Sequence, residues 1–208
     1  MKPSLRTVLA VTTAAALLTG AGVATAAPAA SCNLLADAKG DDGSAVFKHS
    51  ESLDLVGGDI ASSAKTVTAV IRVAKFTKSD TAAAPTGRSW YLEFSIPGGA
   101  TPLWLGAQIT PTGETFRYGW VDGTIRRSLG TALGVFDEAN SEIRVSSAVG
   151  IWAERGSVKP GAKLTGITAA SYNFVGAAAA GGSLQPGDTA ETTNTYTAGA
   201  PSCVKVGK

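Results

Sequence analysis

Residues 89–123 read SWYLEFSIPGGATPLWLGAQITPTGETFRYGWVDG, and this stretch decides the fold. Apolar and polar side chains alternate within it in three runs, which cover 89–96, 103–110 and 114–122. A period of two residues is the spacing of a β-strand with one buried face. The runs end at Pro-Gly-Gly, Pro-Thr-Gly and Asp-Gly, whose residues favour tight turns. The stretch therefore predicts an antiparallel meander of three strands.

Similar patterns surround the meander on both sides. Alternation also predicts a strand at 67–73, and weaker strand candidates are 44–48, 53–62, 132–136, 141–146 and 163–172. Eight or nine short strands with one apolar side favour two packed antiparallel sheets. We therefore expect an all-β fold, a two-sheet antiparallel β-sandwich, with a closed barrel as the alternative.

Three local features refine this expectation. Asp54-Leu55 followed by Gly57-Gly58 predicts a bend or bulge in the strand 53–62. One helical turn is expected at 146–151, because Ser146 can cap it. The Ala/Gly-rich stretch 177–182 is interpreted as a loop.

The N-terminus has the order of a secretory signal peptide. Lys2 and Arg6 precede an uncharged apolar run, and small residues follow it. We therefore expect a signal peptide at 1–26, and a single β-sandwich domain at 27–208 that is secreted to the extracellular space. The apolar run is shorter than the roughly 20 residues that a membrane span needs, so no membrane insertion is expected after cleavage. An uncleaved membrane anchor is the alternative.

The mature chain carries a balanced charge. Removal of 1–26 takes away two of the 18 basic side chains and none of the 16 acidic ones, so 16 of each remain. A nucleic-acid partner is not expected, because such binding requires a basic excess that neutralises phosphates. About 180 residues suffice for one sizeable core and are too few for two comfortable domains. We expect a monomer.

Two cysteines lie near the two ends of the mature chain. An even number of cysteines outside the cytoplasm suggests pairing, so we predict a disulfide between Cys32 and Cys203. Two free thiols are one alternative. A lipid-attachment box ending at Cys32 is another, and it would leave Cys203 without a partner.

Five aspartates fall close together near glycine-rich turns, at positions 37, 41, 42, 54 and 59. Calcium prefers about six to eight oxygen ligands from carboxylates and backbone carbonyls in flexible loops. We therefore predict a calcium site whose ligands are Asp37, Asp41, Asp54 and Asp59. The alternative is that these carboxylates cap turns by accepting backbone N–H bonds.

Two aromatic residues have a parity opposite to that of their apolar neighbours. Tyr91 and Trp104 should therefore face away from the core side of the meander. Aromatic rings on an exposed sheet face can stack on sugar rings, and Gln108 and Arg117 offer polar partners nearby. These four residues are the predicted carbohydrate-binding set, unless both faces of the sheet are covered and the rings belong to the core. The residues assigned to the core are Trp90, Phe94, Phe116 and Trp120, and Trp152 is expected to anchor a connection.

Short motifs spread over about residues 32–203 resemble a known group of domains. They are Leu53-Asp54-Leu55-Val56-Gly57-Gly58-Asp59-Ile60, Trp90–Phe94, Phe116–Gly119, Asn140–Val145, Asp188-Thr189-Ala190 and Pro201-Ser202-Cys203. The pattern resembles secreted bacterial DOMON domains and the related family 9 carbohydrate-binding modules. This resemblance implies a ligand-binding sandwich without catalytic machinery, in a group whose members bind haem or sugars. Haem is not expected here, because the only methionine is Met1 and His49 alone cannot form a Met/His axial pair.

Catalytic arrangements are not indicated. His49 is the only histidine, it stands among polar residues, and no G-x-S-x-G nucleophile elbow accompanies it. We therefore expect a secreted, non-enzymatic module that binds a carbohydrate or another cell-surface ligand, with calcium. The alternatives are a structural or protein-interaction domain of the cell envelope, and a glycosidase that uses two of the carboxyl groups.

Overall fold

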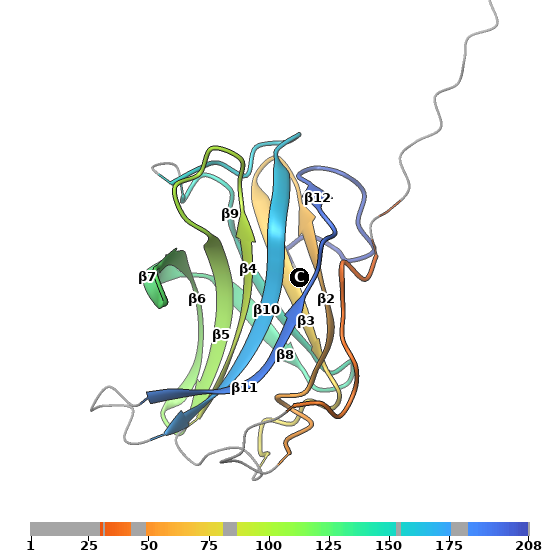
Figure 1. The fold of residues 1–208 in the computed structure, drawn as a ribbon, viewed down its shortest axis with the longest axis vertical. Helices are drawn as coiled ribbons and strands as arrows, with labels where there is room; N and C mark the ends of the chain where they lie inside the picture. The colour runs from red at the N-terminus through yellow and green to blue at the C-terminus, as the bar shows by residue number, and fades with distance from the viewer. Residues whose placement is uncertain are drawn as a thin grey trace, which may run out of the picture.

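The structure is a computed structural model, and it describes residues 30, 32–42, 49–80, 87–152, 155–175 and 183–207. All regular secondary structure in this part of the chain is β, which confirms the predicted all-β class (Figure 1). No helix that is long and apolar enough to span a membrane occurs in these residues. The signal peptide expected at 1–26, the strand at 44–48 and the loop at 177–182 lie outside the described residues.

The strands form two antiparallel sheets, as the sandwich prediction requires. The five-stranded sheet has the order β1-β2-β3-β9-β8 and consists of Leu35–Ala36, Leu55–Ser62, Thr66–Val73, Glu142–Ala148 and Leu133–Asp137. The larger sheet has the order β11-β10-β4-β5-β6-β7 and consists of Ser183–Glu191, Lys163–Val175, Arg88–Ser95, Leu103–Thr110, Gly113–Asp122 and Ile125–Thr131. A short strand β12 (Tyr196–Thr197) pairs with β10.

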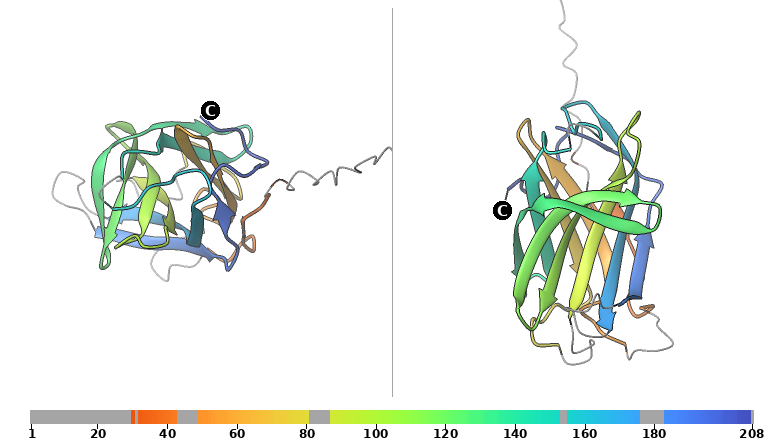
Figure 2. Two further views of the ribbon diagram at one scale, coloured as in Figure 1. Left: turned by 90° about the horizontal axis from the view of Figure 1, so that it is seen from above. Right: turned by 90° about the vertical axis from the view of Figure 1, so that its left-hand side faces the viewer.

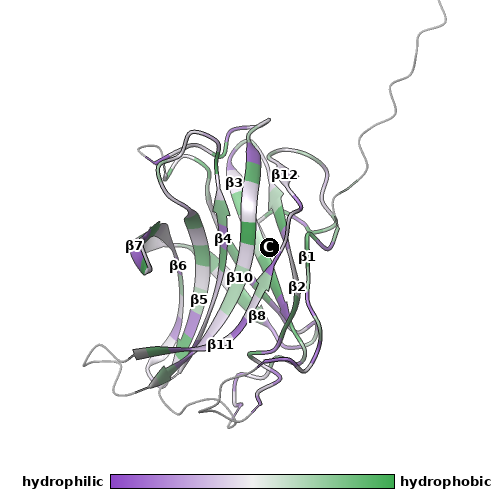
Figure 3. Cartoon of the chain, in the orientation of Figure 1, coloured by the Kyte–Doolittle hydropathy of each residue, from purple (hydrophilic) through white to green (hydrophobic). Residues whose placement is uncertain are grey.

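The predicted meander is β4, β5 and β6, and its alternation builds the core. Trp90 pairs with Ala107 across β4 and β5, and Leu105 pairs with Tyr118 across β5 and β6. Figure 3 shows the resulting alternation of hydrophobic and less hydrophobic residues along β5 and β10. The side chains of Trp90 and Phe94 are fully buried between the sheets, as predicted. Phe116 and Trp120 pack against the same core and are partly buried.

Trp152 anchors the connection between β9 and β10, as predicted. Its ring contacts Phe94 and Tyr118 edge-on, at centroid distances of 5.9 and 5.8 Å. Its indole N–H donates a hydrogen bond to the carbonyl of Gly119 at 3.2 Å. A buried tryptophan with a satisfied N–H contributes a large apolar area without leaving an unpaired polar group.

Two local expectations have opposite outcomes. The bulge is confirmed, because the register of β2 against β3 shifts between Leu55 and Gly57. The helical turn at 146–151 is wrong, because β9 continues to Ala148 and a turn follows it. The hydroxyl of Ser146 lies 2.8 Å from that of Thr68 on β3, so the residue belongs to a sheet ladder and caps no helix. Pairing with strands on both sides outweighs the local capping preference.

The β6–β7 hairpin turns back over the outer face of the larger sheet. Figure 2 (right) shows β7 crossing in front of the other strands of that sheet. The fold-back requires a close approach at Gly119, where an added Cβ would lie 1.8 Å from the carbonyl oxygen of Arg127 and 2.7 Å from the Trp104 ring. Only glycine fits at this position.

The two ends of the described domain are joined covalently. Cys32 and Cys203 form the predicted disulfide, with their Cα atoms 5.2 Å apart. The segment after Cys203 continues along the smaller sheet, where Val204 packs on Ala61 and Val70. The backbone N–H of Gly207 donates to the Thr68 hydroxyl at 2.9 Å. The bridge therefore holds the C-terminal segment against the sandwich.

Candidate functional site

The four residues predicted to bind carbohydrate lie together on the outer face of the larger sheet. Tyr91 on β4, Trp104 and Gln108 on β5, and Arg117 on β6 line one depression with a volume of about 20 Å³. A volume of this size holds about one water molecule. The four residues therefore lie side by side, as expected from the sequence, but the space between them is too small to hold a sugar ring.

Arg126 of β7 covers the aromatic part of this face. Its guanidinium carbon lies 4.6 Å from the ring centre of Tyr91 and 4.8 Å from that of Tyr172. It also bonds the carboxylate of Glu93 at 2.5 Å and the Tyr172 hydroxyl at 2.9 Å. The rings expected to stack on sugar thus already stack on an arginine of the same chain.

Trp104 is the second covered ring. It is only 3% exposed, it meets Tyr91 edge-on at 5.4 Å, and its indole N–H donates to the carbonyl of Trp120 at 3.1 Å. Burial also raises the pKa of the Tyr91 hydroxyl. Trp104 is therefore covered, which is the alternative considered from the sequence, because the β6–β7 hairpin lies over the outer face. Carbohydrate binding at this face stays a prediction.

A second candidate site lies at one end of the sandwich, where acidic residues from three segments meet. Asp37 and Asp41 follow β1, and their carboxylates approach that of Asp188 on β11. One carboxylate oxygen from each lies within 4.8 Å of the other two. This trio is named here the all-oxygen cluster.

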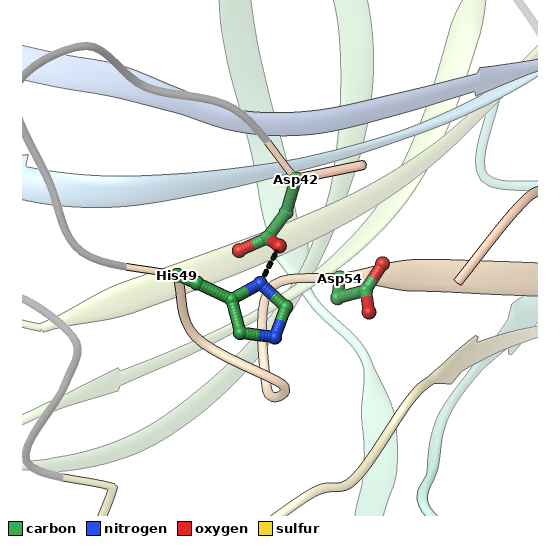
Figure 4. Close-up of side chains that lie close together, drawn as sticks. All are labelled: Asp42, His49 and Asp54. Atoms are coloured by element: carbon green, nitrogen blue, oxygen red, sulfur yellow. Dashed lines mark hydrogen bonds and ion pairs between the residues drawn. The ribbon is translucent and has the colours of Figure 1, made fainter. Parts of the chain in front are cut away.

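A second trio adjoins the first. Asp42, His49 and Asp54 each place one potential ligand atom within 4.8 Å of the other two (Figure 4). Asp42 and His49 come from the segments on either side of residues 43–48, and Asp54 directly precedes β2. This trio is named here the imidazole cluster. Two of the four predicted metal ligands, Asp37 and Asp41, therefore lie in one cluster, and Asp54 lies in the other.

Backbone N–H groups orient the carboxylates of both clusters. One Asp54 oxygen accepts from Gly40 at 2.8 Å, and one Asp188 oxygen accepts from Leu55 at 2.8 Å. Asp37 accepts from Ala38 at 3.0 Å, and Asp42 accepts from Ser50 at 2.9 Å. The other Asp188 oxygen accepts from Thr189 at 2.7 Å. Turn capping, the alternative considered from the sequence, thus accounts for one oxygen of Asp37, Asp42 and Asp54 and for both oxygens of Asp188.

The other oxygens of two carboxylates are buried without a donor. Among the described residues, no hydrogen-bond partner reaches Oδ1 of Asp54 or Oδ2 of Asp37. Asp54 as a whole is 0% exposed. Burying a carboxylate oxygen without a partner is costly, and native proteins rarely leave such groups unsatisfied. A bound cation is one way to satisfy them.

The electrostatics of this end favour a cation. The pKa of Asp37, of Asp54 and of Asp188 is raised in each case, first by desolvation. Repulsion from neighbouring carboxylates adds to the rise, and Asp41 acts on all three groups. A divalent cation would stabilise the ionised forms that burial and like charge disfavour.

Without a divalent cation, we expect these three carboxyls to lower stability as the pH rises. Their folded-state pKa lies above the unfolded value, so the folded state binds more protons in the intervening window, and the free energy of unfolding falls through that window. Thermal unfolding in chelator from about pH 4 to about pH 7 measures the effect. A variant with all three aspartates changed to asparagine should lose this decline. Parallel pH profiles of parent and variant would contradict the prediction.

Asp59, the fourth predicted metal ligand, does not join either cluster. It lies further along β2, is 1% exposed, and bonds Arg72 at 2.7 Å and the backbone N–H of Leu34 at 2.9 Å. Arg72 also bonds Glu142 at 3.0 Å. Asp59 therefore ties the N-terminal segment to β3 through a buried ion pair.

Asp188 is the residue of this end that the cation prediction missed. It is far from Asp54 in the sequence, and it stands beside Pro186-Gly187, which reads as a turn. His49, the only histidine, has a side chain that is 51% exposed, and it contacts Asp42.

Comparisons with known proteins leave the site to be interpreted from its geometry. The chain matches no protein-family model, and neither a curated protein nor a solved structure shows significant similarity to it. The resemblance to DOMON domains and family 9 carbohydrate-binding modules therefore stays a prediction from the sequence.

Proposed function

We propose that this protein is a non-enzymatic, extracytoplasmic ligand-binding module that binds calcium through the all-oxygen cluster. The observation that carries the proposal is the convergence of Asp37, Asp41 and Asp188, with Oδ2 of Asp37 buried and lacking a donor among the described residues. Calcium takes carboxylate, carbonyl and water oxygens in irregular geometry, which suits ligands from a turn and a strand.

The disulfide supports the proposed compartment. Structural disulfides form and persist in oxidising environments outside the bacterial cytoplasm. The Cys32–Cys203 bridge and the signal-peptide pattern of residues 1–26 agree on this point.

In this proposal, calcium both joins two segments of the chain and binds the ligand. The ion would join the segment after β1 to β11, beside the Leu55–Asp188 hydrogen bond that ties β11 to β2. A calcium ion at a loop end keeps water in part of its coordination sphere, and hydroxyl or carboxylate oxygens can replace that water. A carbohydrate or another cell-surface ligand would bind there. A structural or protein-interaction role in the cell envelope is the competing proposal.

Calcium is expected to raise the midpoint of thermal unfolding in a saturable way, and chelator to reverse the rise. Asp188→Asn should weaken calcium binding about tenfold or more, because it removes a ligand charge. The asparagine oxygen can still accept one of the two backbone hydrogen bonds of Asp188, which come from Leu55 and Thr189. Calorimetric titration with calcium measures the affinity of each chain.

The matched control is Asp122→Asn, at an exposed aspartate that pairs with Arg127 at 3.3 Å on β7. This variant should bind calcium like the parent. If neither calcium nor chelator shifts the unfolding midpoint of the parent chain, the proposed calcium site does not exist.

A further inference from the structure

We propose that Asp42, His49 and Asp54 form a second cation site, selective for a transition metal such as zinc. The inference goes beyond the proposed calcium function, because the imidazole cluster differs from the all-oxygen cluster in its ligand chemistry. Its potential ligand atoms lie within 4.8 Å of one another, and one of them is an imidazole nitrogen (Figure 4). Imidazole nitrogen suits zinc, copper, iron and nickel, whereas calcium and magnesium prefer oxygen alone.

Two buried carboxylates favour cation binding at this site. Asp54 is 0% exposed, and its Oδ1 has no hydrogen-bond partner within the described segments. The side chain of Asp42 is 5% exposed. Buried carboxylate oxygens that lack donors gain more from a bound cation than solvated ones do, because water no longer competes for them.

The surrounding backbone fixes both carboxylates. Gly40 donates to Oδ2 of Asp54 at 2.8 Å, and Ser50 donates to Oδ2 of Asp42 at 2.9 Å. Each carboxylate therefore has one oxygen held by the backbone. The second oxygen of Asp54 has no partner among the described residues, and that of Asp42 faces His49. Hydrogen bonds of this kind orient metal ligands and raise metal affinity.

His49 and Asp42 already share a hydrogen bond between Nδ1 and Oδ1. Metal binding replaces a proton, because imidazole and carboxylate bind metals in their deprotonated forms. Zinc binding would displace the proton of this hydrogen bond to solvent, and the two atoms would then bind the ion. No oxidant or other reactant is needed.

The site is reachable from solvent. His49 lines an open depression of about 370 Å³, whose other walls are Glu51, Ser52, Lys75, Thr77 and Asp80. Three protein ligands leave one position of a tetrahedral zinc ion open, which is the arrangement that admits water or an added ligand. The half-exposed His49 imidazole therefore offers an incoming ion its first ligand from solvent.

The test uses the mature chain without a histidine tag, so that His49 is the only imidazole present. After removal of metals with chelator, calorimetric titration with zinc should show one tight equivalent. The imidazole resonances of His49 should shift in step with that equivalent. His49→Ala should lower the zinc affinity about a hundredfold or more, since a ligand outweighs an outer-shell partner.

Two controls separate this site from the calcium site. Glu51→Gln lies on the same depression outside the cluster and should leave zinc affinity unchanged. Asp188→Asn should weaken calcium and spare zinc, and His49→Ala should do the reverse. Zinc binding that is unaffected by His49→Ala, or zinc that calcium displaces at equal concentration, would overturn the proposal. Circular dichroism confirms that each variant is folded.

Discussion

Replacement of both Cys32 and Cys203 by serine is expected to lower the free energy of unfolding by about 5 kcal/mol. The bridge spans a sequence separation of 171 residues, which is nearly the whole of the predicted mature chain. In the loop-entropy model, a cross-link over such a length restricts the unfolded chain by about 5 kcal/mol. Few single features of a domain this size are expected to contribute as much.

The structure indicates which segments should lose stability first when the disulfide is removed. β1 is two residues long, and it pairs with β2 through Leu35 and Gly58 and through Ala36 and Gly57. The C-terminal segment holds to the smaller sheet through Val204 and the Gly207 hydrogen bond. Once the bridge is lost, these two ends should separate and exchange their amide protons faster than the core strands.

Urea unfolding of the oxidised parent and the double serine variant measures the difference. Reduction of the parent should reproduce the variant, which controls for the substitutions themselves. A stability difference below about 1 kcal/mol, with equal m-values, would contradict the entropic argument.

Much of the fold follows from the sequence because its strands have one buried face. The meander at 89–122 could be predicted from alternation alone, and the Gly57-Gly58 bulge from the glycines. The disulfide could be predicted from the expected extracytoplasmic compartment and from the even number of cysteines. These predictions rest on features that can be read from the sequence itself, namely side-chain periodicity, turn-forming residues and the number of cysteines.

The features that were missed depend on contacts between distant segments. β7 shows no alternation, because it crosses the outer face of its sheet and buries Arg126 between two tyrosines instead of an apolar stripe. β11 carries Pro186, which an edge strand tolerates because that edge need not donate a hydrogen bond. No strand was predicted around Pro186, so nothing in the sequence indicated that Asp188 lies near Asp37 and Asp41. The all-oxygen cluster could therefore be predicted only in part.

The aspartates show the same limit most clearly. Asp54 and Asp59 lie on either side of the bulge in β2, and composition alone does not distinguish them. The structure separates them, because Asp54 ends in a carboxylate without a donor on one oxygen, whereas Asp59 faces Arg72. The guanidinium of Arg72 neutralises the Asp59 carboxylate, and the Asp54 carboxylate remains available for a cation.

Asp59→Ala is therefore expected to lower the free energy of unfolding by about 3 kcal/mol without changing calcium affinity. Removing one partner of a buried ion pair leaves the other charge uncompensated. The Asp59 side chain is 1% exposed and that of Arg72 is 24% exposed, and Arg72 keeps Glu142. The loss should therefore stand at the lower end of the range for buried pairs, about 3–5 kcal/mol.

Asp59→Asn separates the charge from the hydrogen bond. The asparagine oxygen can still accept from the backbone N–H of Leu34, so this variant should lose less stability than Asp59→Ala. Urea unfolding and calcium titration of both variants, beside Asp188→Asn, measure the two effects independently. A stable Asp59→Ala chain with weakened calcium binding would return Asp59 to the cation site. A destabilised chain with normal calcium binding would place Asp59 in a structural ion pair outside the calcium site, because Arg72 stands opposite it.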